Sequence, residues 1–171
     1  YRNLFFVPLL VLFTIANGEM HLATIYPQNV SLSYSGYSGI LLVVFLMSVM
    51  SGRVIPMFTA NGTQTTKATP NILLDKLANG SLLLATLMLL LHPLVGFVPM
   101  FFGAILIVAG VFQLIRSLRW RPWITLGLPL LWSLHFALQF MWFGLILLGF
   151  SYIFDEIPTN HVWHLLTIGG I

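Results

Sequence analysis

Histidine and acidic side chains carry the metal-binding chemistry that this 171-residue chain could perform, because it has five histidines, four acidic residues and no cysteine. Imidazole and carboxylate ligands without thiolate suit copper, zinc or haem iron. A disulfide, a thiolate metal site and a catalytic thiol are excluded. The chemistry therefore depends on where the histidines lie.

His161 and His164 are three residues apart, so both rings can face the same way on a helix. We predict that they form a metal pair, and that His21 is a further ligand, either of this metal or of haem. The alternative interpretation is two interfacial histidines at the start of a helix. His21 shares a helical face with Asn17 and two threonines, and in lipid such a face should point into the bundle. Hydrogen bonds between helices would also explain this face without any ligand.

His135 is the histidine that lies deepest in an apolar run. Trp132, Gln139 and Trp142 fall on its helical face, and phenylalanines stand beside it. Aromatic rings flanking a histidine and a glutamine could wall a flat cofactor, and a histidine within a membrane needs a partner. We therefore predict cofactor contact through His135 and Gln139. Aromatic packing around one buried polar pair is the alternative.

The elements that must position these residues are apolar helices. Hydrophobic residues make up 58% of the chain and charged residues only 6%, whereas a soluble domain carries about 25% charged residues. Runs of about 20 apolar residues predict an all-α transmembrane bundle with five full spans and the start of a sixth. We expect one integral-membrane domain over residues 1–171. The predicted spans are 4–26, 37–51, 77–92, 99–115 and 126–150, followed by a sixth from residue 161.

The basic residues orient this bundle. Every Lys and Arg precedes the first span or lies in or beside the second and fourth connections, and the other connections have none. The positive-inside rule therefore places the residue 1 end in the cytoplasm and the loops 27–36 and 151–160 outside. Most histidines then lie towards the outer face. The basic residues are Arg2, Arg53, Lys67, Lys76, Arg116, Arg119 and Arg121.

The stretch that ends the second span combines several unusual residues. Ser51-Gly52 allows another helix to approach closely, and Arg53 brings a charge to the edge of the hydrocarbon. Pro56 is expected to break the helix, and Asn61-Gly62 is a turn signal. We consider this stretch a candidate site.

The fourth connection interleaves Arg116, Arg119 and Arg121 with Trp120 and Trp123, which is typical of an interfacial anchor. The basic loops are short and adjoin spans, so we expect the partners to be the lipid bilayer and anionic lipid, with no nucleic acid. The chain contains no phosphate-binding Gly-rich loop, G-x-S-x-G or HExxH motif. No catalytic residue is predicted.

Four stretches resemble the NnrS family of bacterial inner-membrane proteins: residues 2–6 with Asn17 and His21, 52–61, 129–135 and 164–169. The resemblance implies an interior portion of a protein of about twelve spans, whose own remaining helices would be its partners. It also implies haem and copper as cofactors and a role in the response to nitric oxide and nitrosative stress. On this hypothesis Arg53 could contact a haem propionate near the inner face; a helix-end anchor and the lip of a pathway are the alternative roles. The outer face is then periplasmic.

Three hypotheses for function follow. The first is a haem- and metal-binding membrane protein of the nitric oxide response. The second is a transporter or channel whose polar helix faces line a path for substrate. The third is a structural module in which polar residues only join helices. No electron-entry motif is visible, so we do not expect an enzyme; an enzymatic activity would be that of a membrane oxidoreductase acting on nitrogen oxides.

Overall fold

The computed structural model describes residues 4, 6–28, 31–96, 98–154 and 156–170, and most of these residues are helical. These residues contain no strand. Along the chain the elements are α1 (Phe6–Ile25), α2 (Leu32–Thr63), α3 (Ile72–Leu90), α4 (His92–Val95), α5 (Pro99–Leu118), the 3-10 helix η1 (Pro122–Thr125), α6 (Pro129–Ser151) and α7 (Thr159–Gly170).

Five of these helices, α1, α2, α3, α5 and α6, are long and apolar enough to cross a membrane, judged by length and composition. They correspond one to one with the five predicted spans, and α7 begins where the sixth was expected. The predicted all-α transmembrane bundle is therefore confirmed.

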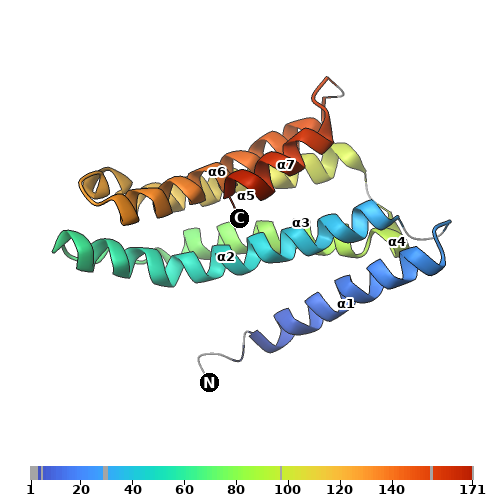
Figure 1. Ribbon diagram of the computed structural model, residues 1–171, viewed down its shortest axis with the longest axis horizontal. Helices are drawn as coiled ribbons and strands as arrows, with labels where there is room; N and C mark the ends of the chain where they lie inside the picture. The colour runs from blue at the N-terminus through green and yellow to red at the C-terminus, as the bar shows by residue number, and fades with distance from the viewer. Residues whose placement is uncertain (1–3, 5, 29–30, 97, 155, 171) are drawn as a thin grey trace.

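The long helices pack mainly on their neighbours in the chain (Figure 1). α5 and α6 form the closest pair, α3 packs on α2 and α5, and α7 packs on α6. α1 packs on α2 along one edge of the bundle and buries only Leu9, Ala16 and Ala23. The core therefore lies among α2, α3, α5 and α6, and these helices position the polar residues described below.

The predicted break at Pro56 is wrong. α2 is 32 residues long, continues through Pro56 and ends at Thr63, where the C-cap residue Gln64 has a left-handed backbone (φ 53°, ψ 37°). Asn61-Gly62 accordingly lies inside the helix and forms no turn. Proline is tolerated within membrane helices because neighbouring helices can satisfy the backbone groups that it frees. At 1.5 Å per residue α2 is about 48 Å long, so it must tilt or project beyond a hydrocarbon core of about 30 Å.

Two other boundaries also differ from the prediction. α3 begins five residues before the expected start, at Ile72, because Asn71 caps it by accepting a hydrogen bond from the Leu74 N–H at 3.1 Å. α6 begins at Pro129 rather than near residue 126, because η1 and a short turn precede it. His135 therefore lies in the second turn of α6, near the end of the bundle that carries the basic residues.

The α5–α6 pair is close because glycines face each other across it. A Cβ atom added at Gly103 would lie 2.5 Å from the carbonyl oxygen of Gly149, and one added at Gly149 would lie 2.5 Å from the carbonyl oxygen of Gly103. Small residues let helix backbones approach in this way in membranes, where dispersion contacts replace the hydrophobic effect. The glycine pair therefore sets the separation of α5 and α6.

Gly149→Ala should lower the free energy of unfolding by about 1–3 kcal/mol, because the added methyl group meets backbone that cannot move aside. The matched control is Gly80→Ala on α3, where an added Cβ meets no atom within 4 Å. The control should leave stability unchanged or raise it. Thermal unfolding of both variants in detergent measures the difference, and equal midpoints would contradict the close α5–α6 contact.

Candidate functional site

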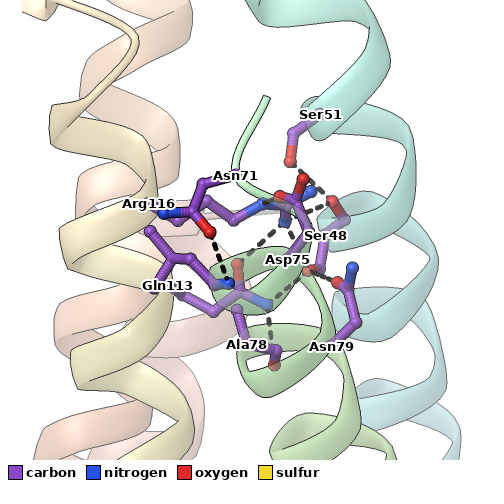
Figure 2. Close-up of polar contacts among 9 residues, drawn as sticks. Ser48, Ser51, Asn71, Asp75, Ala78, Asn79, Gln113 and Arg116 are labelled. Atoms are coloured by element: carbon purple, nitrogen blue, oxygen red, sulfur yellow. Dashed lines mark hydrogen bonds and ion pairs between the residues drawn. The ribbon is translucent and has the colours of Figure 1, made fainter. Parts of the chain in front are cut away.

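An arginine is buried among three helices at the basic end of the bundle. Arg116 lies in the last turn of α5, and its side chain is only 5% exposed. Its Nε donates to Oδ1 of Asp75 on α3 at 2.6 Å, and the Asp75 side chain is 37% exposed (Figure 2). The pair therefore connects a buried cation to a carboxylate near the surface.

The remaining contacts of this arginine form a polar cluster with α2 and α3. Arg116 Nη1 donates to the Ser48 carbonyl oxygen at 3.0 Å and to Oε1 of Gln113 at 3.1 Å. Gln113 Nε2 in turn donates to Ser48 Oγ and to the Ala78 carbonyl oxygen, the latter at 3.2 Å. Ser48 Oγ donates to Oδ1 of Asn79 at 2.6 Å (Figure 2). The polar cluster thus joins α2, α3 and α5.

Gly52 makes room for this arginine. A Cβ atom at Gly52 would overlap the Arg116 guanidinium, so any larger residue there would displace it. The Trp120 ring lies on another side, with its centroid 5.2 Å from the guanidinium carbon, which is within the range of a cation–π contact. A buried charge is costly unless it is paired and hydrogen-bonded, and these contacts supply the compensation.

His135 is a second buried polar residue at this end of the bundle. It is 2% exposed, and its Nε2 is hydrogen-bonded to Thr59 Oγ1 of α2 at 2.9 Å. Its Nδ1 is buried and has no hydrogen-bond partner within the described residues. One helical turn further on, Gln139 Nε2 donates to Ser117 Oγ of α5 at 3.0 Å. The polar partner of His135 is therefore Thr59 of α2, and the predicted cofactor contact through His135 and Gln139 stays a prediction.

An apolar groove of about 400 Å³ runs past this histidine. Trp123, Trp132, Phe136 and Phe143 line it, and all four are substantially exposed on the outside of the bundle. A groove of this size is within the usual range for a small-molecule site. The sequence-based prediction of aromatic rings around His135 and Gln139 agrees with this lining.

The family model described as NnrS protein matches residues 1–171, the whole chain. The chain belongs to the NnrS family. No curated protein and no solved structure matches it. The resemblance predicted from the four sequence stretches is thus confirmed, and NnrS membership with five membrane-length helices indicates a multi-pass membrane protein.

The family resemblance implies a haem, and the surroundings of His135 can be compared with what a haem ligand needs. A histidine that ligates a metal typically holds one ring nitrogen in a hydrogen bond and offers the other to the metal. His135 has one nitrogen bound to Thr59 and one without a partner, beside an apolar aromatic groove. The chemistry of these residues, an imidazole nitrogen without a partner among the described residues and aromatic rings beside it, is the kind that a flat macrocycle with a nitrogen ligand requires.

The other predicted ligands lie apart from this groove. His161 and His164 are exposed on α7, His21 is exposed on α1, and Arg53 is exposed on α2. Among the described residues no group of three or more His, Asp or Glu side chains could hold a metal ion. Asp155 lies outside the described residues. The metal pair and the role of Arg53 therefore stay predictions.

Sequence analysis missed the polar cluster, because Arg116 was interpreted as an interfacial anchor. A signal was present: Gln113 and Arg116 are three residues apart in an apolar run, so they share a face of α5. Ser48 and Asn79 are polar residues within other spans. Polar residues inside spans face the bundle interior, so these four side chains could have been grouped.

Asp75→Asn should destabilise the protein, because it leaves the buried Arg116 charge without its counter-ion. Losing the partner of a fully buried pair costs about 3–5 kcal/mol, and the partial exposure of Asp75 reduces the expected loss to about 1–3 kcal/mol. Lys76→Gln, an exposed charge change at the next residue, is the control and should change stability by less than about 0.5 kcal/mol. Chemical denaturation in detergent compares them, and equal stabilities would refute the role of the ion pair.

Proposed function

We propose that this NnrS-family chain belongs to a haem- and metal-binding membrane protein of the nitric oxide response. Family membership supports the nitric oxide response, and His135 carries the proposal of haem. His135 lines the aromatic groove, and its buried Nδ1 has no partner among the described residues, so one imidazole nitrogen is left for a ligand.

Each residue of the groove has a distinct part in this proposal. His135 supplies the nitrogen ligand, and Thr59 fixes the orientation of its ring through the 2.9 Å hydrogen bond. Trp132, Phe136 and the other rings provide apolar walls that exclude water. Bound haem iron would supply a site for nitric oxide, with a potential set by its axial ligand and by the surrounding polarity.

A copper site on α7 is the second part of the proposal. His161 and His164 are both exposed near the start of α7 and are spaced for one face of a helix. Two imidazoles are suitable ligands for copper but do not complete a site, and no third His, Asp or Glu among the described residues joins them. The proposed role is binding of a ligand rather than catalysis.

The proposed orientation places the protein in the bacterial inner membrane. The end at residue 1, the 64–71 connection and the 119–128 connection are cytoplasmic, and the loops 27–36 and 151–160 are periplasmic. The positive-inside rule supports this, since all basic residues fall on the first side. The haem groove would then lie towards the cytoplasm and the α7 histidines towards the periplasm.

Transport through the membrane is a second candidate, and the polar cluster favours it. Ionisable residues within membrane spans often mark pathways for ions or substrates, and Arg116 is such a residue. However, its guanidinium is held by Asp75, Ser48 and Gln113, which also suits a purely structural role. Flux of anions into proteoliposomes that is lost in Arg116→Gln would support transport.

Haem and copper should be lost from different variants of the purified full-length protein. His135→Ala should remove most of the haem absorbance and leave the copper content unchanged. His161→Ala with His164→Ala should remove copper and leave haem unchanged, so each variant is the control for the other. Optical spectra and elemental analysis on monodisperse samples give both readings.

A colourless wild-type protein would contradict the haem proposal, and a His135→Ala variant with a full haem complement would contradict the assignment of the ligand. Copper retained after loss of both α7 histidines would refute the metal pair.

A further inference from the structure

A cavity opens beside the polar cluster, separate from the aromatic groove. Its volume is about 180 Å³, and α2, α3, α5 and the 64–71 connection enclose it. Gly52 and Pro56 of α2 form one wall, and the start of α3 forms another. The polar and charged residues that line it are Lys67, Thr69, Asn71, Asp75, Arg116 and Arg119.

The lining carries three cations and one carboxylate, a formal net charge of +2. Asp75 is already bound by Arg116 Nε, so it does not neutralise the others. The side chains of Lys67 and Arg119 make no hydrogen bond or ion pair with any described residue. Arg116 Nη2, which faces Gly52, likewise has no acceptor within the described ranges. The cavity therefore presents donors and positive charge that no described residue uses.

We propose that this cavity binds a phosphate group. An apolar cavity of about 150 Å³ accommodates benzene, so this one has room for a tetrahedral phosphate. Guanidinium groups recognise phosphate oxygens in pairs, and lysine adds a mobile positive charge. The cavity also adjoins the amino-terminal end of α3, where the helix dipole favours an anion.

The tryptophans at this end indicate where the phosphate comes from. Trp123 is 59% exposed and Trp120 lines the cavity, and tryptophan favours the level of the lipid headgroups. A phosphate at this level is either the headgroup of an anionic lipid or free phosphate from the aqueous phase. Both sources present the same chemistry to Lys67, Arg116 and Arg119.

The test compares two double variants of the full-length protein in detergent. Lys67→Gln/Arg119→Gln removes two cations of the cavity, and Lys76→Gln/Arg121→Gln removes one Lys and one Arg at the same end but outside it. All four residues are exposed, so both variants should fold. Microscale thermophoresis measures binding of phosphatidylglycerol, inorganic phosphate and diacylglycerol, which lacks the phosphate.

The cavity variant should bind phosphatidylglycerol or inorganic phosphate at least about tenfold more weakly than wild type, because each charge-assisted hydrogen bond to phosphate that it loses contributes about tenfold or more. The matched variant should stay within about twofold. If the cavity variant binds phosphatidylglycerol more weakly but inorganic phosphate as wild type does, the bound phosphate is a lipid headgroup. If it also binds inorganic phosphate more weakly, the bound phosphate is a free anion. Equal weakening in both double variants, or diacylglycerol binding as tight as phosphatidylglycerol, would overturn the proposal. None of these binding measurements depends on haem or copper.

Discussion

A guanidinium buried among three helices is the interaction on which the basic end of this bundle depends. Arg116 could not remain there without Asp75 of α3 and the Ser48 carbonyl of α2, because an uncompensated charge inside a span is expensive. Its donors therefore decide which faces of α2, α3 and α5 meet. Gly52 is part of the same constraint, since a side chain there would occupy the place of the guanidinium.

The position of His135 follows from this arrangement. Its partner Thr59 lies on α2 beyond Pro56, so the histidine is held only if α2 stays helical through the proline. Gln139 reaches Ser117, the residue next to Arg116 on α5, and ties α6 to the polar cluster. Close glycine contacts between α5 and α6 complete the frame. The aromatic groove and the cavity beside the polar cluster share only α5: α6 and η1 provide most of the groove, and α2, α3 and the 64–71 connection provide most of the cavity.

The helical class and the number of spans could be predicted from the sequence, because the lengths of apolar runs report directly on the membrane. The burial of His135 and the aromatic residues around it could also be predicted, from the residues of a single span. The continuity of α2 through Pro56 could not be predicted, because proline breaks helices in water but is tolerated where neighbouring helices pack against it. The ion pair of the polar cluster could not be predicted either, because Arg116 and Asp75 are 41 residues apart in the sequence. The spacing of residues within one helix does not show which other helix they will contact.

A double-mutant cycle between Asp75→Asn and Arg116→Gln tests the dependence of the bundle on this buried ion pair most directly. If the two groups stabilise the fold through each other, the double variant should lose less stability than the sum of the single losses, by at least about 1 kcal/mol. Losses that add to within about 0.5 kcal/mol would show independent residues and would contradict the account.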